Sequence, residues 1–179
     1  MTSARIKELE KSISTEVSPV LRQEGFVFDR RMRTFRRQVG SCFQIINFQL
    51  GTRSMEGHFT VNLGIYHPVY REDPNSECPE FPEESHCLIR ERLSLLRDTT
   101  LTKIFRHKFK QVDSFLKWWL TTPTDVWWKF SEAPGQTRNS MAAVLTLLQA
   151  RGLPWLEAAC SVEKLRTIHE EHQRRRGKI

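Results

Sequence analysis

The stretch QIINFQLGTRSMEGHFTVNLGIY, residues 44–66, contains two apolar runs joined by a turn that is bounded by glycines. In the second run Phe59, Val61 and Leu63 alternate with polar or small residues, a period of two that is typical of a strand with one buried face. Ile46 and Phe48 alternate with amides in the first run. The stretch therefore predicts two neighbouring antiparallel strands, because the link between them is short.

Amides occupy the positions between these apolar residues. If Ile46 and Phe48 join the core, Asn47, Gln49 and Asn62 lie together on the other face, which Tyr66 shares. An amide that is buried without a partner costs about 1–3 kcal/mol. We therefore predict a polar cluster whose amides either satisfy one another within the fold or bind a polar ligand.

Further strands are predicted on both sides of this pair. The runs at residues 26–28 and 31–39 precede it and are separated by short turns, which favours an antiparallel meander. The run CLIRERLSLL, residues 87–96, alternates as a strand does but also fits a helix. The proline-rich, acidic residues between 67 and 86 predict a loop. The expected sheet has four or five strands.

Helical periodicity marks the two ends of the chain. Apolar residues recur at three- and four-residue steps from Ile6 to Leu21, and Gly25 is placed to end this helix. Pro19 predicts a kink or break near Ser18. Downstream we expect an amphipathic helix over 101–120, a short helix within 122–130 with Asp125 near its beginning, another through 141–148 and a terminal helix after residue 161.

These elements predict an α+β fold, in which an N-terminal helix and C-terminal helices pack on an antiparallel meander. We expect one α+β domain over residues 1–165, followed by the basic end of a helix and a tail over 166–179. The N-terminus lacks the apolar segment of a signal peptide, and no apolar run is long enough to span a bilayer. We therefore expect a cytoplasmic protein that does not insert in a membrane, with its four cysteines as thiols.

Motifs for catalysis and cofactor binding are sparse. The chain lacks the glycine-rich phosphate-binding patterns, and Cys78, His86 and Cys87 do not match a common zinc spacing. Cys87 has adjacent and more distant histidines, but a cysteine nucleophile needs a base that lies near it in space. We therefore predict no cofactor, no metal site and no catalytic residue, and favour a protein that is not an enzyme.

Tryptophan and arginine suggest a protein-binding role. These two residue types dominate binding hot spots, and the chain has five tryptophans and a net charge of +7. We expect a binding protein for an unknown protein partner, of a class that includes immunity-type proteins which neutralise toxins. The predicted interface residues are Trp119, Trp128, Arg33, Arg37 and Arg106.

Nucleic-acid binding is the main alternative, because excess positive charge attracts phosphates. Arginines lie on both faces of the run RRMRTFRRQ, and the predicted 101–120 helix adds a basic side. The residues that would form this patch are Arg31, Arg33, Arg37, Lys103, Arg106 and Lys110. A small polar ligand bound by the amide cluster is the second alternative.

Several short motifs together resemble a known family. GF at residues 25–26, INFQ at 46–49, FTVNLGIY at 59–66, DVWW at 125–128 and GLPWLE at 152–157 occur in this order. The chain resembles, over roughly residues 3–165, the bacterial family described only as domain of unknown function 4304. The resemblance implies a soluble α+β domain without an established activity, and assigns to its framework Asn47, Gln49, Asn62, Trp127 and Trp128. The basic run from residue 30 to 37 and the basic tail depart from the pattern.

Overall fold

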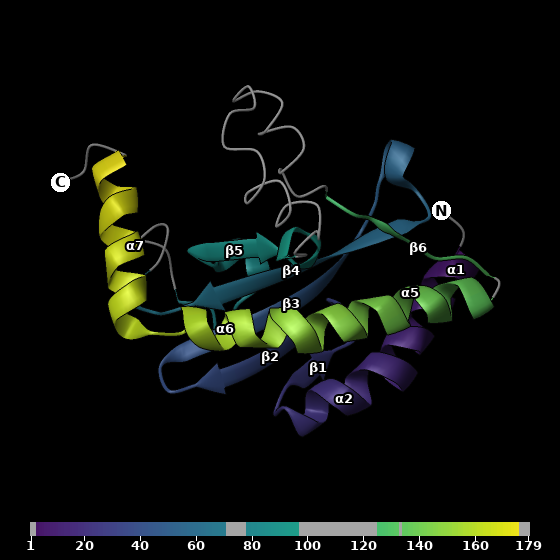
Figure 1. The fold of residues 1–179 in the computed structure, drawn as a ribbon, viewed down its shortest axis with the longest axis horizontal. Coiled ribbons are helices and arrows are strands. Elements are labelled where there is room, and N and C mark those ends of the chain that lie inside the picture. The colour runs from purple at the N-terminus through teal and green to yellow at the C-terminus, as the bar shows by residue number, and fades with distance from the viewer. Residues whose placement is uncertain (1–2, 71–77, 97–124, 133, 176–179) are drawn as a thin grey trace, which may run out of the picture.

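A computed structural model describes residues 3–70, 78–96, 125–132 and 134–175 of the chain. The fold is α+β, as the sequence predicts, with one antiparallel sheet and helices from both ends of the chain (Figure 1). The helix predicted over 101–120 lies outside the described residues.

The sheet is a meander in which strands β1 to β5 lie side by side in chain order. The strands are β1 Val27–Asp29, β2 Thr34–Val39, β3 Cys42–Leu50, β4 His58–Tyr66 and β5 Ile89–Arg92. The sequence prediction for residues 44–66 is confirmed in register, because Asn47 pairs with Asn62 and Phe48 with Val61. Within residues 87–96 the chain forms β5 and then a 3-10 turn, η4 Leu93–Leu96. The strand interpretation of this run is therefore confirmed and the helical one is wrong.

The prediction of a short helix around Asp125 is wrong. Instead, Trp128 and Lys129 form β6, which pairs with the start of β4. The backbone N–H of Phe130 extends this pairing by donating to the carbonyl of Gly57 at 2.9 Å. Val126, Trp128 and Phe130 alternate with other residues, and β-branched and aromatic side chains favour strands. The segment therefore follows the edge of β4 that β5 occupies further along.

The N-terminal helix continues through its proline. It consists of α1 Ser3–Ser12, a π-helical turn η1 Ile13–Val17, and α2 Ser18–Gln23. A proline cannot donate to the carbonyl four residues before it, and the wider π turn that ends one residue short of Pro19 accommodates this loss. The predicted disturbance near Ser18 is thus a π turn. The helix ends at Gln23, and Gly25 follows its C-cap with a φ of 81°.

The C-terminal helices repeat the same arrangement. They are α5 Pro134–Leu147, a π-helical turn η5 Leu148–Gly152, α6 Leu153–Ala159 and α7 Val162–Arg175. Pro154 is the second residue of α6, just as Pro19 is the second residue of α2. α5 and α6 run across the sheet, whereas α7 turns away at one end (Figure 1).

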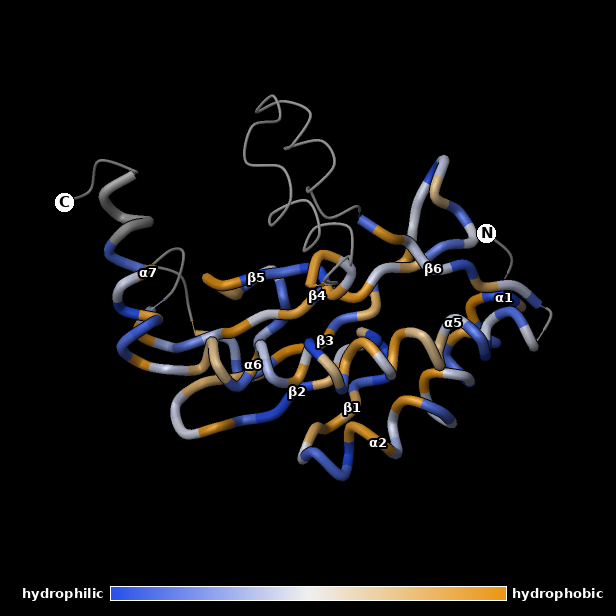
Figure 2. The backbone as a smooth tube through the Cα atoms, in the orientation of Figure 1, coloured by the Kyte–Doolittle hydropathy of each residue, from blue (hydrophilic) through white to orange (hydrophobic). Residues whose placement is uncertain are grey.

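The main core lies between the helices and one face of the sheet. Ile46, Phe48, Val61 and Leu63 are fully or almost fully buried there, as their alternation predicts. Apolar positions recur along α5, β3 and β4 to form this layer (Figure 2). Residues from both helical regions complete it, including Leu9, Ile13, Val17, Met141, Val144, Leu148 and Leu156.

The opposite face, which we call the outer face, has a smaller core of its own. Ile45, Tyr66 and Cys87 are buried together, with Phe43 packed against them. Cys87 follows the 3-10 turn η3 Glu84–His86, which lies within the loop that the sequence predicts. Part of the outer face is thus covered by this loop, and the remainder positions the candidate sites.

Candidate functional site

A groove on the outer face lies over the first strands of the sheet. Its volume is about 530 Å³. We call it the β1 groove, and its lining side chains are Val27, Phe28, Asp29, Arg36, Gln38, Phe43, Glu80 and Phe81. The first six come from β1, β2 and β3, and the last two from the loop that precedes η3.

Arg36 holds the two walls of the β1 groove together. Its Nε donates to the carbonyl of Pro82 at 2.7 Å, and its Nη1 lies 3.1 Å from Oδ2 of Asp29. The Arg36 side chain is only 11% exposed, so this link is shielded from water. Burial acts to raise the pKa of Asp29, but the backbone N–H of Met32 and the Arg36 guanidinium outweigh it, so the pKa lies below its ordinary value.

Exposed apolar side chains gather at the same groove. Val27 is 74% exposed and Phe81 is 66% exposed. These are two of five large apolar residues that are exposed in the described part of the chain. Within the described chain β1 pairs only with β2, so it is an edge strand of the sheet. The β1 groove therefore combines an open edge, apolar surface and a fixed ion pair.

The β1 groove is not among the sites that the sequence predicts. Phe81 lies between Pro79 and Pro82 in an acidic loop, and a large apolar side chain in such a polar segment is the signal that the sequence offers. The loop reaches the sheet because Arg36 binds the carbonyl of Pro82. A contact between residues 46 positions apart has no local pattern that would predict it.

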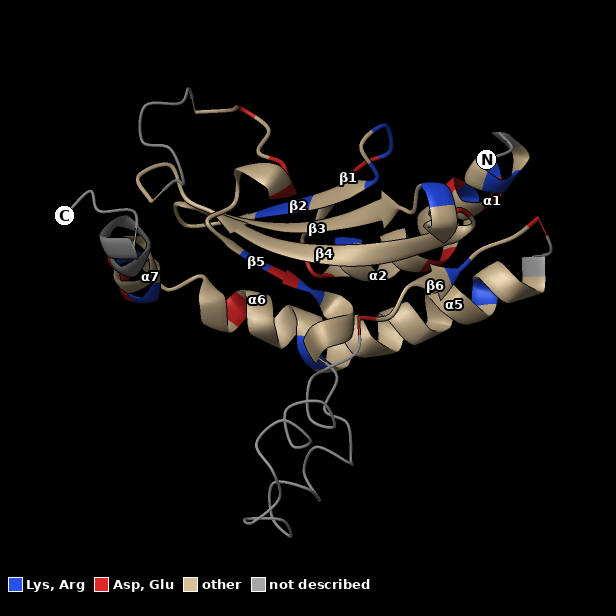
Figure 3. Cartoon of the chain, turned by 90° about the horizontal axis from the view of Figure 1, so that it is seen from above, with Lys and Arg blue, Asp and Glu red and all other residues tan. Residues whose placement is uncertain are grey.

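A polar cavity lies over the other side of the outer face. It has a volume of about 270 Å³ and is lined by Gln49, Asn62, Glu84, Arg90, Glu91, Arg92 and Leu95. Basic and acidic residues alternate along β5 beside it (Figure 3). Burial raises the pKa of Glu84, and the nearby guanidinium groups of Arg90 and Arg92 only partly oppose this. The polar cavity thus offers charges of both signs.

Asp125 fixes one wall of the polar cavity. Its carboxylate pairs with Nη1 of Arg92, accepts a hydrogen bond from Oγ of Ser94 at 2.8 Å, and accepts another from Nε1 of Trp127 at 3.2 Å. The Arg92 guanidinium also lies over the Trp127 ring, 5.3 Å from its centroid. DVWW is therefore a motif in which Asp125 and Trp127 position Arg92.

The predicted amide cluster is divided between two local sites. Nδ2 of Asn62 donates to Oε1 of Gln49 at 2.8 Å, and this pair lines the polar cavity. Asn47 lies on the same face but donates to the carbonyl of Met32 and to Oγ1 of Thr34 at 2.8 Å, closing the turn between β1 and β2. Tyr66 is buried in the outer core. The amides thus share a face without forming one network.

Of the two tryptophans predicted to lie in an interface, the structure describes only Trp128. Trp128 is 9% exposed and stacks on Phe59, so it belongs to the core and Trp127 is the half-buried member of the pair. The pair occupies an extended segment, in which neighbouring side chains point to opposite sides. Trp119 and Arg106 lie outside the described residues.

Arg37 is part of a buried network. Its Nε and Nη2 donate to Oε1 of the fully buried Gln44 at 2.8 and 2.6 Å, and its Nη1 donates to the carbonyl of Glu24 at 2.7 Å. Gln44 in turn donates to the carbonyl of Leu156. Arg37 also lies over the ring of Phe26. This arginine joins the N-terminal helix, the sheet and α6.

Only some of the residues predicted to contact nucleic acid lie in the described part of the chain. Arg31 is exposed in the turn between β1 and β2, where basic residues are conspicuous (Figure 3). Arg33 has a φ of 50° and pairs with Glu10 at 3.4 Å, so it holds this turn against the N-terminal helix. Lys103, Arg106 and Lys110 lie outside the described residues.

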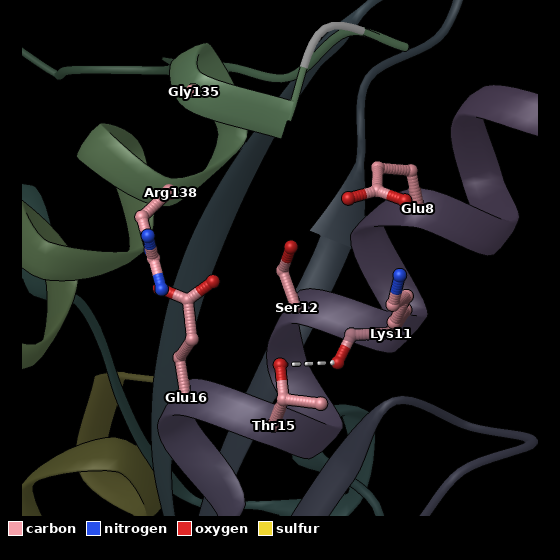
Figure 4. Close-up of a pocket in the computed structure, with 7 residues that line it drawn as sticks. All are labelled: Glu8, Lys11, Ser12, Thr15, Glu16, Gly135 and Arg138. Atoms are coloured by element: carbon pink, nitrogen blue, oxygen red, sulfur yellow. Dashed lines mark hydrogen bonds between the residues drawn. The ribbon is translucent and has the colours of Figure 1, made fainter.

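Another cavity, of about 290 Å³, lies between the N-terminal helix and the start of α5. Figure 4 shows Glu16 and Arg138 pointing toward one another across it, with Ser12 directed into the space between the helices. Lys11 and Glu8 also line it, so acidic and basic residues are balanced in number. This cavity has no distinct preference for an anion or a cation.

Neither a metal site nor a membrane-spanning helix is found among the described residues. No group of three or more His, Cys, Asp and Glu side chains is arranged to hold a metal ion in this part of the chain. Nδ1 of His86 accepts the backbone N–H of Glu83, which gives this imidazole a capping role. In the same residues, no helix has both the length and the apolar character to cross a bilayer.

Comparison with known proteins identifies the family. No curated protein and no solved structure matches the chain. The model of the family described as Domain of unknown function (DUF4304) matches residues 17–158, which include the whole described sheet, α5 and nearly all of α6. The resemblance carried by the five short motifs is thereby confirmed, and the chain belongs to the DUF4304 family.

Proposed function

We propose that this protein is a non-enzymatic protein-binding module whose partner occupies the β1 groove. The observation that supports the proposal is the exposure of Val27 and Phe81 in one groove. Burying a valine or phenylalanine side chain contributes about 1.5–3 kcal/mol relative to leaving it exposed. Two such side chains beside an arginine resemble the centre of a protein interface.

The edge position of β1 favours an extended partner segment. An exposed sheet edge can pair with an added strand, and alternate side chains of that strand then enter neighbouring pockets. Val27 projects on the same face as Arg36, since the two are register partners. The proposed occupant is an extended protein segment that places an apolar side chain between Val27 and Phe81.

An intracellular role as an immunity-type protein is a specific form of this proposal. Such a protein acts by covering a surface of a toxin, so it needs a stable domain and an interface instead of catalytic groups. The β1 groove would supply that interface. We would then expect this protein to be produced together with a toxin. Variants with substitutions in the β1 groove should fail to protect the cell from that toxin.

The proposal is tested by pull-down from native lysate, in which the unaltered protein is compared with groove variants as bait. We expect nuclease-treated lysate to yield specific proteins with the unaltered chain, and to lose them with Val27→Ser, Phe81→Ser and the double variant. Val69→Ser is the matched control, because Val69 is 67% exposed but does not line the β1 groove. Circular dichroism and thermal melting would establish that each variant remains folded.

Two outcomes would count against the β1 groove. Retention of the same proteins by the folded double variant would place the interface elsewhere. Recovery that depends entirely on nucleic acid would support the basic residues as the binding surface, and affinity for labelled RNA or DNA should then fall steeply with salt.

A small polar ligand in the polar cavity is a second candidate function. It is favoured by the Asn62–Gln49 pair, because this hydrogen bond leaves an amide oxygen and an amide NH₂ for another partner. Thermal-shift screening with nucleosides, amino acids and sugars would test it. A shift that is lost in Gln49→Ala but kept in Gln38→Ala would support the polar cavity, and no shift with any of these compounds would remove the candidate.

A further inference from the structure

Two cysteines that are far apart in the sequence, Cys42 and Cys160, lie close together beside the hairpin between β2 and β3. Cys42 is the first residue of β3, and Cys160 follows α6 as its C-cap. Sγ of Cys42 lies 3.9 Å from the carbonyl oxygen of Cys160, although the two residues are 118 positions apart. Sγ of Cys160 lies 4.0 Å from the carbonyl oxygen of Val39, which is the register partner of Cys42.

The two thiols also act on each other. Burial, together with hydrogen bonding and charge interaction with the Cys160 side chain, raises the pKa of Cys42 to about 12. Both sulfur atoms therefore occupy one small region between the hairpin and the end of α6. This placement is specific to the pair, because Cys87 lies in the outer core and Cys78 is exposed in the loop before η3.

The cysteines of the pair differ in access to solvent. Cys42 is 1% exposed, whereas Cys160 is partly exposed. A small oxidant can therefore reach Cys160 first, with Cys42 held behind it. A partly exposed thiol with a second thiol beside it is the arrangement of a redox-sensitive site.

We propose that Cys42 and Cys160 form a reversible oxidation site, in which hydrogen peroxide converts the two thiols to an intramolecular disulfide. The Cys160 thiolate attacks one peroxide oxygen, the O–O bond breaks, and the other oxygen leaves as water after taking a proton. Cys160 is then a sulfenic acid. The sulfur of Cys42 attacks that of Cys160, the S–O bond breaks, and water leaves with the Cys42 proton.

The reaction balances without another reactant. Two thiols and one hydrogen peroxide give one disulfide and two water molecules, and a thiol reductant reverses the change. The high pKa of Cys42 makes it a poor first nucleophile, because the thiolate is the reactive form, and so assigns it the second step. Hydrogen peroxide at millimolar concentration is the oxidant to use in a test of this reaction.

The disulfide would change how the C-terminal helices are attached. Cys160 lies directly between α6 and α7, and Cys42 begins the central strand β3. α7 contacts the remainder of the fold through the buried Leu165 and through His169, whose ring lies 5.7 Å from that of Tyr70. A covalent link would fix the start of α7 to the sheet. This inference is independent of the proposed protein-binding function.

The test counts thiols in a Cys78→Ser background, which removes the exposed cysteine. Three thiols should react with maleimide after denaturation, and one should remain reactive after peroxide treatment. Non-reducing peptide mapping should join the peptides that contain Cys42 and Cys160. The melting temperature should rise by about 5 °C or more, as expected for a link that closes a long loop, and dithiothreitol should reverse all three changes.

Two matched variants make the result decisive. Cys87→Ser in the same background should retain the cross-link and leave no reactive thiol, whereas Cys160→Ser should abolish it. The proposal is overturned if three thiols remain reactive in the Cys78→Ser protein, or if Cys160 accumulates as sulfinic acid without a cross-link. It is also overturned if the mapped disulfide contains Cys87.

Discussion

Cys87 packs directly on Gly64, which lies in the second half of β4. A Cβ atom at position 64 would be 2.6 Å from Sγ of Cys87 and 3.1 Å from its Cβ. Glycine usually weakens a strand, so its presence here has a packing reason. The absence of a side chain lets the segment after η3 rest on the outer face, which positions the loop that forms one wall of the β1 groove.

Gly64→Ala should therefore destabilise the fold by about 1–3 kcal/mol, because the added methyl group overpacks a buried contact. Urea unfolding monitored by circular dichroism measures this change. In a Cys87→Ala background the sulfur is absent, so the same substitution should cost less. An equal cost in both backgrounds would show that Cys87 is not the obstacle.

Gln44→Leu should cost about 2–3 kcal/mol in the free energy of unfolding. The substitution removes the acceptor for Arg37 and the donor to the carbonyl of Leu156, and buried polar groups without partners are costly. Gln38→Leu is the matched control, since Gln38 is an exposed amide of the neighbouring strand and should change stability by less than about 0.5 kcal/mol. Similar losses in both variants would contradict the role of this network.

Stability should fall on acidification through the protonation of His67. Nδ1 of this buried imidazole accepts the backbone N–H groups of Val69 and Tyr70, so Nε2 carries the proton and donates to Oγ of Ser41 at 2.8 Å. Burial lowers the pKa of His67 below its ordinary value of 6.5. The unfolded chain thus takes up the proton more readily than the folded one.

The contribution of neutral His67 should be complete above pH 6.5 and should be lost as the pH falls from 6.5 through the lower folded pKa. Urea unfolding between pH 8 and pH 5 measures the loss. A His67→Gln variant should lack this part of the pH dependence, and His58→Gln, which changes a histidine at the start of β4, should keep it. An unchanged profile in His67→Gln would assign the acid sensitivity to other groups.

Asp125→Ala should destabilise the wall of the polar cavity by about 2 kcal/mol. Ser94 is fully buried and would lose its acceptor, while Arg92 and Trp127 would lose theirs. Unfolding in urea measures the loss, and tryptophan fluorescence should change because Nε1 of Trp127 becomes free. Glu80→Ala, an exposed carboxylate elsewhere on the outer face, should leave both stability and fluorescence nearly unchanged.

The period-two pattern of residues 44–66 predicted the central strands, their faces and the side on which the amides lie. It could not predict how the amides pair, because Asn47 turns toward Met32 and Thr34 while Asn62 turns toward Gln49. Partner choice depends on neighbouring turns and strands that the alternation does not describe.

The arginines show a second reason why site prediction was incomplete. Charge and spacing suggested that Arg33 and Arg37 face a partner, but the structure places them against Glu10 and Gln44. A long arginine side chain can cover apolar surface and reach a distant acceptor, so its position in a strand does not determine its role. The β1 groove has no signal in the local sequence for a related reason, because its loop is held by a long-range contact of Arg36.

The two π turns, η1 and η5, determine where the helices of this fold can gain or lose a residue. A π turn contains one residue more than an α turn, and each of the two here precedes a proline by one residue. Removing one residue from Ile13–Val17 together with Pro19→Ala would restore a plain α-helix and keep the following apolar residues facing the sheet. A residue removed elsewhere in the helix would instead rotate the following apolar residues by about 100°. The two π turns are therefore the places where these helices can change in length by one residue while their apolar faces stay on the sheet.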